Sequence, residues 1–178
     1  MNGIFIIAEI GGEIGERIRA HQLRFDPKMA REAPPHVTII GSSGAGSIAP
    51  TTPVMALRNA IVPVADSMAP LTLRFGPPMR FLQREIVVLP LDPHGPIREL
   101  HEKLKTSGLA FASARYPFTP HCTLSFYPTI TRESLREMLA VREEGQWTLD
   151  TLRVYHTRNP QPPKLLFDAK LASPGGAA

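Results

Sequence analysis

The chain of 178 residues has a single cysteine, Cys122, so it can form no internal disulfide and lacks the clustered thiolates of a structural zinc site. No apolar run approaches the roughly 18 residues that a membrane-spanning helix needs. The first residues lack the basic segment of a signal peptide, and Glu9 interrupts their apolar run. These absences predict a cytoplasmic protein in a reducing compartment with no membrane partner.

Runs of lysine and arginine typical of a nucleic-acid-binding arm are also missing, although the net charge of +4 suits an anionic ligand. No group of cysteine, histidine and carboxylate residues has the spacing of a metal site, so we expect neither a metal nor a cofactor. No obligate protein partner is evident. We expect any phosphate to be held by a few placed side chains rather than by a broad basic patch.

Hydrophobic periodicity predicts the secondary structure, with many of the 19 prolines falling in loops between apolar runs. Strands are predicted over residues 3–10, 36–40, 71–75, 84–91, 121–126, 146–156 and 164–171. Helices are predicted over 13–25, 53–67, 96–107 and 131–142, with Pro63 expected to kink or end the second. The Gly- and Ser-rich segment 41–50 is expected to be a flexible loop. Since helices alternate with some strands while other strands pair as hairpins, the predicted fold class is α+β.

Two of the predicted strands begin with the same short pattern, Pro35-His36-Val37-Thr38-Ile39 and Pro120-His121-Cys122-Thr123-Leu124. With six histidines in the chain, roughly 0.4 His-x-Thr matches are expected by chance. Two matches that also share the preceding proline and the following aliphatic residue therefore indicate a common role.

The geometry of a strand indicates what this pattern does, because side chains alternate between the two faces of a strand. The histidine and threonine of each motif share a polar face, and the residues between them form an apolar face that packs in the core. Cys122 lies on the apolar face, so we expect a core residue rather than a nucleophile. Ser125 shares the polar face with His121.

A pair of imidazoles facing one phosphate suits acid–base catalysis near neutral pH, where histidine titrates. A neutral imidazole can take a proton from the attacking oxygen, and a charged imidazole can donate one to the leaving oxygen. The hydroxyls of Thr38 and Thr123 can donate to the non-bridging phosphate oxygens. No metal is needed for this chemistry.

With these two motifs about 85 residues apart, the chain resembles the two-histidine phosphoesterase superfamily, and within it the 2′-5′ RNA ligase and RNA 2′,3′-cyclic phosphodiesterase family. The resemblance extends over about residues 3–171. It implies a bilobal fold with a pseudo-twofold axis, two mainly antiparallel sheets flanked by helices, and an active-site cleft between the lobes. It further implies catalysis by His36 and His121, phosphate binding by Thr38 and Thr123, and His36 as the acid with His121 as the base.

Three functions are compatible with this interpretation. The first is hydrolysis of 2′,3′-cyclic phosphate ends of RNA or of related cyclic nucleotides. The second is RNA 2′-5′ ligation on the same site, and the third is non-catalytic binding of RNA or a nucleotide. Further substrate contacts are predicted for Arg115, Tyr116, Phe118 and Ser125.

The remaining histidines, His21, His94, His101 and His156, have no shared pattern around them and are expected to be solvated. Residues 1–172 are predicted to form one bilobal domain, and residues 173–178 a flexible C-terminal tail.

Overall fold

The computed structural model describes residues 2–81, 84–126 and 130–172. Nine strands and five helices lie within these ranges. The strands are β1 (Asn2–Glu9), β2 (His36–Ile40), β3 (Leu71–Leu73), β4 (Met79–Arg80), β5 (Val87–Pro90), β6 (His121–Ser125), β7 (Trp147–Leu149), β8 (Thr151–Arg158) and β9 (Gln161–Lys170). The helices are α1 (Gly12–Phe25), α2 (Pro27–Glu32), α3 (Val54–Asp66), α4 (Pro96–Lys105) and α5 (Arg132–Ala140).

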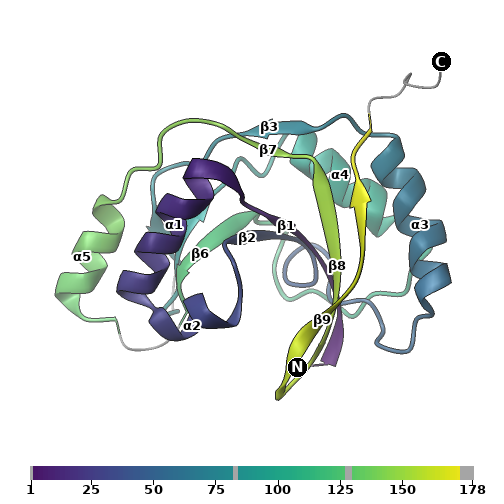
Figure 1. Ribbon diagram of the computed structural model, residues 1–178, viewed down its shortest axis with the longest axis horizontal. Coiled ribbons are helices and arrows are strands. Elements are labelled where there is room, and N and C mark those ends of the chain that lie inside the picture. The colour runs from purple at the N-terminus through teal and green to yellow at the C-terminus, as the bar shows by residue number, and fades with distance from the viewer. Residues whose placement is uncertain (1, 82–83, 127–129, 173–178) are drawn as a thin grey trace.

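A seven-stranded antiparallel sheet in the order β4-β5-β6-β2-β1-β8-β9 forms the centre of the molecule, and β3 pairs with β7 in a small second sheet. Helices α1, α2 and α5 lie toward one end of the large sheet and α3 and α4 toward the other (Figure 1). The predicted α+β class with mainly antiparallel sheets is therefore confirmed. The two sheets are of unequal size, and both histidine strands belong to the larger one.

The centre of the large sheet carries an internal repeat. In the first half, β1 is followed by α1 and then by β2, which pairs antiparallel with β1. In the second half, β5 is followed by α4 and then by β6, which pairs antiparallel with β5. The two histidine strands, β2 and β6, meet each other where the halves join. This arrangement places the duplicated motifs on adjacent strands.

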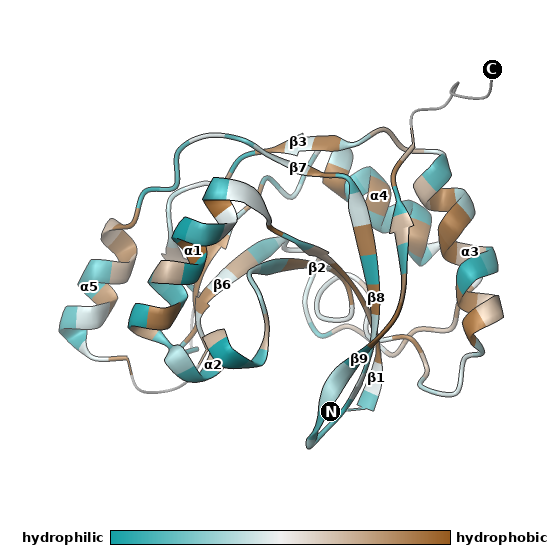
Figure 2. Cartoon of the chain, in the orientation of Figure 1, coloured by the Kyte–Doolittle hydropathy of each residue, from teal (hydrophilic) through white to brown (hydrophobic). Residues whose placement is uncertain are grey.

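The helices are amphipathic and turn their apolar residues toward one continuous core, as the mixture of brown and teal on α3 and α4 shows (Figure 2). In α4, the buried residues follow helical spacing, and Pro96 occupies the first turn, where a missing N–H costs nothing. In α1, Ile14 and Ile18 are buried at the same spacing. Burial on this side leaves the opposite face of the central strands to carry polar side chains.

The structure differs from the local predictions at three places. Helix α3 does not end at Pro63 but runs on to Asp66, where its packing on β9 and α4 offsets the single missing donor. Segment 41–50 is not a freely exposed loop: Ala45 and Ile48 are buried, and Ile48 forms bridges to Ile4 and Phe111. The short helix α2 was not predicted, although Asp26 caps it by accepting from the backbone N–H of Met29.

Candidate active site

Each histidine strand buries one face and leaves the other accessible. Along β2 and along β6, the histidine and threonine are partly exposed while the residue between them is buried. The predicted alternation of the two motifs is thus confirmed. Cys122 is fully buried, and burial raises the pKa of its thiol to about 12, which agrees with a core role.

The register between the two strands brings the motifs together. Val37 is the partner of Cys122 in the antiparallel pairing of β2 with β6. Continuing this register one residue each way sets His36 against Thr123 and Thr38 against His121. The two histidines are therefore diagonal neighbours on a single face of the sheet. Diagonal neighbours on antiparallel strands lie about 7–8 Å apart.

Both imidazoles are held in the same way by the backbone two residues upstream. Nδ1 of His36 donates to the carbonyl oxygen of Pro34 at 2.8 Å, and Nδ1 of His121 donates to the carbonyl oxygen of Thr119 at 2.7 Å. A carbonyl oxygen can only accept, so the proton of the neutral ring lies on Nδ1. Nε2 is then the atom of each ring that remains to exchange a proton with a ligand.

The segments before the two histidines are anchored equivalently as well. The N–H of Ile10, just after β1, donates to the carbonyl of Pro35 at 2.9 Å. The N–H of Leu91, just after β5, donates to the carbonyl of Pro120 at 2.9 Å. Each bond fixes the proline that precedes a catalytic candidate, and the match between them supports the pseudo-twofold relation of the halves.

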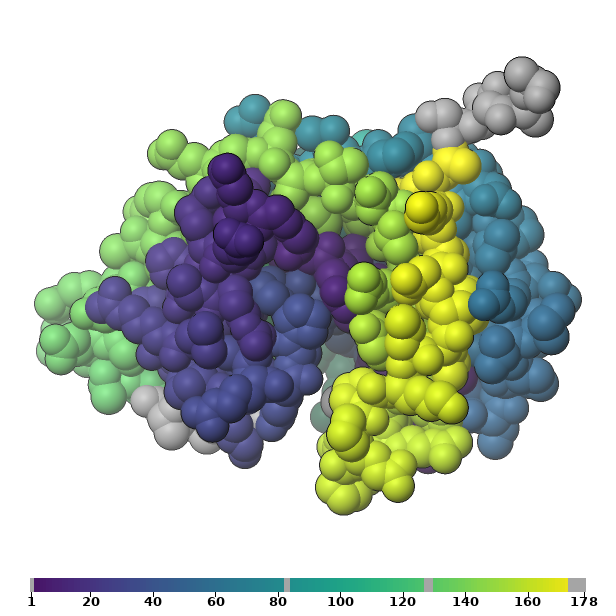
Figure 3. All heavy atoms as spheres, viewed as in Figure 1, coloured from purple at the N-terminus to yellow at the C-terminus, as the bar shows by residue number. Residues whose placement is uncertain are grey.

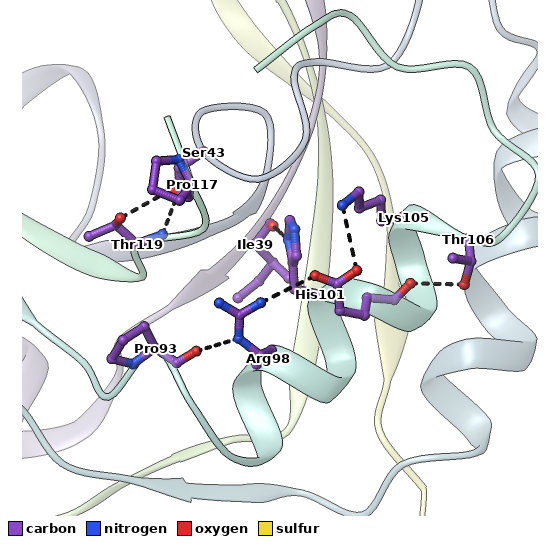
Figure 4. Close-up of polar contacts among 10 residues, drawn as sticks. Ile39, Ser43, Pro93, Arg98, His101, Lys105, Thr106, Pro117 and Thr119 are labelled. Atoms are coloured by element: carbon purple, nitrogen blue, oxygen red, sulfur yellow. Dashed lines mark hydrogen bonds and ion pairs between the residues drawn. The ribbon is translucent and has the colours of Figure 1, made fainter. Parts of the chain in front are cut away.

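A network of polar contacts positions the segment before His121 (Figure 4). The hydroxyl of Ser43 accepts from the backbone N–H of Thr119 at 3.0 Å. The Thr119 hydroxyl donates to the carbonyl of Pro117 at 3.0 Å. Because the Thr119 carbonyl in turn accepts from His121, Ser43 in segment 41–50 helps to orient this imidazole. The Gly- and Ser-rich segment is thus part of the support of the site.

His101 lies beneath this network and was wrongly expected to be solvated. It is fully buried on α4, donates from Nδ1 to the carbonyl of Ile39 at 2.8 Å, and stacks on Phe118 at a centroid distance of 3.9 Å. His156 on β8 is also buried rather than solvated. These side chains had no motif around them, so only the tertiary structure identifies them as core residues.

The two catalytic candidates differ in their surroundings. Burial lowers the pKa of His121, and the charge of neighbouring His36 lowers it further, although the bond to Thr119 raises it. The ring of Phe81, in the turn after β4, meets the His121 ring edge-on at a centroid distance of 5.0 Å. The lowered pKa favours the neutral form of His121, which is the form that a general base requires.

The structure separates the four residues predicted as further substrate contacts. Arg115 and Tyr116 are exposed, and the Tyr116 hydroxyl accepts from Nη2 of Arg84 at 3.1 Å. Phe118 is buried against His101, which favours a core role. Ser125 is buried at the end of β6, where its hydroxyl lies 3.4 Å from a carboxylate oxygen of Asp26.

Sequence reasoning missed a polar cluster on the same face, beyond His36. Glu9 is the register partner of His36 on β1, and its carboxylate accepts from Arg153 at 2.9 Å and from the Tyr155 hydroxyl at 3.0 Å. Phe81 beside His121 was also missed. The period-two alternation of β1 and β8 places Glu9, Arg153 and Tyr155 on partly exposed positions, but only strand pairing shows that they adjoin the histidines.

Two cavities lie near the candidate site, and neither has a motif residue in its lining. One, of about 910 Å³, begins at Glu9 and extends between α1, β7, β8 and β9. Figure 3 shows the surface hollowed between the α1–α2 segment and strands β8 and β9. The other, of about 470 Å³, is lined by Gly44, by α4 and by residues 114–118. The first cavity reaches the face of the two motifs at Glu9, the register partner of His36, and the second lies against the segment that precedes Thr119.

Within residues 2–81, 84–126 and 130–172, no three histidine, cysteine or carboxylate side chains are grouped so as to hold a metal ion. Nor does this part of the chain contain a helix with the length and apolar character needed to cross a membrane.

The fold agrees with the one that the resemblance to the two-histidine phosphoesterase superfamily implies. A family profile described as the 2′-5′ RNA ligase superfamily matches residues 10–161, which is most of the chain. The chain therefore belongs to the 2′-5′ RNA ligase superfamily, and the resemblance seen in its sequence is confirmed. A search of curated proteins found no match.

Solved structures agree on the fold. E. coli LigT complexed with phosphate is 15% identical, with a TM-score of 0.61 over 96% of this chain and 98% of LigT. E. coli LigT complexed with 3′-AMP is 17% identical, with the same TM-score and coverage. The protein TT0787 of Thermus thermophilus is 16% identical, with a TM-score of 0.69 over 98% of this chain and 100% of TT0787. At such identities the likeness shows the fold alone.

Proposed function

We propose that this protein is a cytoplasmic, metal-independent phosphodiesterase that opens 2′,3′-cyclic phosphate ends of RNA or of related cyclic nucleotides. The observation that carries the proposal is the diagonal placement of two identically held histidines on one face, each opposite a threonine. The family membership and the likeness to a protein solved with phosphate and with 3′-AMP support the same substrate chemistry.

The surroundings of the two rings support His121 as the base and His36 as the acid. Burial and the charge of His36 both favour a neutral His121, and the acid role falls to His36. In this state Nε2 of His121 takes a proton from water as the water oxygen forms its bond to phosphorus. The bond from phosphorus to the ribose oxygen breaks, and Nε2–H of His36 donates its proton to that oxygen. Proton exchange with solvent restores both rings.

The threonines complete the proposed site. Thr38 and Thr123 lie on the other diagonal of the same four-residue arrangement, so their hydroxyls face the phosphate between the imidazoles. Donation to the non-bridging oxygens would hold the phosphate in line with the attacking and leaving oxygens. Every protein group that this scheme uses is a side chain of β2 or β6.

RNA 2′-5′ ligation is the second candidate, because the matching family carries that activity in its description. On the same site, an RNA hydroxyl would replace water as the group that loses its proton to the base. A protein that only binds RNA would need neither an acid nor a base, and the presence of both histidines and both threonines disfavours that role.

The test is incubation of EDTA-treated protein with a panel of 2′,3′-cyclic mononucleotides and cyclic-ended oligoribonucleotides, with and without a second RNA carrying a free 5′-hydroxyl. Conversion to phosphomonoesters supports the proposal, and joined strands with a 2′-5′ linkage support the second candidate. Binding without either product would leave only the non-catalytic role and would refute both activities.

A further inference from the structure

The two histidine strands are joined over a short distance. Among the described residues, β2 and β6 pair at one position, Val37 with Cys122. By contrast, β1 pairs with β2 at four positions, and β5 pairs with β6 at four positions. Backbone pairing therefore fixes each motif firmly within its own half of the repeat but contributes little to the relation between the two motifs. Because the proposed reaction needs both imidazoles at one phosphate, contacts outside the strand pairing have to set that relation.

Each half of the repeat packs its helix on the histidine strand of the other half. Helix α1 follows β1 in the first half and contacts β6 in the second (Figure 1). Helix α4 follows β5 in the second half and contacts β2 in the first. Each of these contacts contains a buried polar side chain. On α1 this is Gln22, which is 4% exposed, and on α4 it is His101, which is fully buried.

The two side chains hold the histidine strands in the same way. Nε2 of Gln22 donates to the carbonyl oxygen of Thr123 at 2.8 Å. Nδ1 of His101 donates to the carbonyl oxygen of Ile39 at 2.8 Å, and Figure 4 shows these two residues side by side. Both accepting carbonyls lie within two residues of the position at which β2 and β6 pair. A side-chain donor from the opposite half therefore supplements the pairing of each strand close to its motif.

A second polar atom of each side chain is buried without a partner. Among the described residues, Oε1 of Gln22 and Nε2 of His101 make no hydrogen bond. A buried polar atom without a partner lowers the stability of the fold, and an apolar side chain of similar size would avoid this cost. Placement of a strand is therefore the benefit that both side chains share.

We propose, resting on the proposed function, that Gln22 and His101 are positioning residues that together hold His36 and His121 at one phosphate. Gln22 acts from the first half on the second motif, and His101 acts from the second half on the first motif. Neither side chain touches the substrate. Each acts through the backbone of the strand that it holds, so the loss of either donor shifts one motif relative to the other.

Methionine substitutions test the two donors, because methionine has about the length of glutamine but donates no hydrogen bond. In Gln22→Met and His101→Met, kcat for a 2′,3′-cyclic mononucleotide should fall by roughly 10–10²-fold, since small misplacements of reacting groups have effects of this size. KM should change by less than about threefold, because the phosphate donors are retained. His101→Gln keeps a donor and should keep kcat within about threefold of the parent value.

Two control variants lie on the same two helices. Ile18→Met and Leu100→Met replace fully buried apolar side chains of α1 and α4. They should leave kcat close to that of the parent, because a core tolerates changes that conserve volume. The double variant Gln22→Met/His101→Met should lose much less than the product of the two single losses, because both donors hold one arrangement. Thermal melting verifies folding, and if His101→Met does not fold, Gln22→Met and His101→Gln still carry the comparison.

A measurement that needs no turnover separates this inference from the proposed function. The imidazole NMR signals of His36 and His121 should shift in Gln22→Met and in His101→Met, and should stay at the parent positions in the two control variants. A parent that opens no cyclic phosphate refutes the proposed function, and shifted signals then still support the positioning of the two rings. Unchanged signals or unchanged kcat in both donor variants, equal kcat losses in the control variants, or losses that multiply in the double variant would overturn the inference.

Discussion

His101 is expected to make the fold sensitive to mild acid. Its ring is fully buried, and its Nε2 has no hydrogen-bond partner among the described residues. Burial lowers its pKa most; the bond to Ile39 and the charge of Glu102 raise it, whereas Lys105 and Arg98 lower it. The His101 ring has little space to move, because Gly44 packs closely against it: a β-carbon added to Gly44 would lie 2.3 Å from Nε2.

The sign of the effect follows from proton linkage. The pKa of His101 is lower in the folded protein than in the unfolded chain, where it is about 6.5, so the unfolded chain binds the proton more readily. The stability contributed by neutral His101 is intact above pH 6.5 and declines as the pH falls below it. If the folded protein excludes the proton throughout, the loss between pH 7.5 and 5.5 is about 1.4 kcal/mol.

The assay is urea unfolding of the parent and of His101→Gln at pH 7.5, 6.5 and 5.5. Glutamine can still donate to the Ile39 carbonyl but does not titrate, so its free energy of unfolding should fall less over the interval, by up to about 1.4 kcal/mol. Contributions from His121 and His156, whose pKa values are also lowered, are common to both proteins and cancel. Identical pH dependence of parent and variant would refute the reasoning.

Further predictions concern the reaction, each measured as steady-state turnover of a 2′,3′-cyclic phosphate. His36→Ala and His121→Ala should each lower kcat by about 10²–10⁴-fold, and the double variant by much less than the product, because acid and base act as a unit. Additive losses would contradict that coupling. Thr38→Ala and Thr123→Ala should have milder effects, since each removes one donor to phosphate, and a larger loss than either histidine variant would argue against this role. The acid limb of kcat/KM should lie below pH 6.5, because the pKa of the proposed base His121 is lowered and activity is lost as the pH falls through it; a limb above 6.5 would exclude His121 as the base. EDTA should leave turnover unchanged, whereas loss that a divalent cation reverses would show metal dependence.

Much of the local structure could be predicted from the sequence. The alternation in the two Pro-His-x-Thr-aliphatic segments determines which side chains share a face, since period two is a property of any extended strand. The same reasoning placed Cys122 in the core. Helices α1 and α4 were predictable because their apolar residues recur at helical spacing. The α+β class followed from the order of these elements.

Local patterns could not place residues that depend on distant partners. Segment 41–50 has the composition of a loop, yet bridges from Ile48 to Ile4 and Phe111 bury its centre. The alternation across residues 146–156 predicts a single strand. The structure divides it into β7, which pairs with β3 in the small sheet, and β8, which belongs to the large sheet. Pro63 stays within helix α3 because this helix packs against β9 and α4.

For the candidate site, the sequence by itself determined the residue types, their faces and their likeness to a known family. Only the tertiary structure decided that β2 and β6 are neighbours in a register that pairs Val37 with Cys122, across about 85 residues of chain. The physical reason is that backbone geometry fixes where a side chain points, whereas the choice of neighbouring strand depends on burying one shared core.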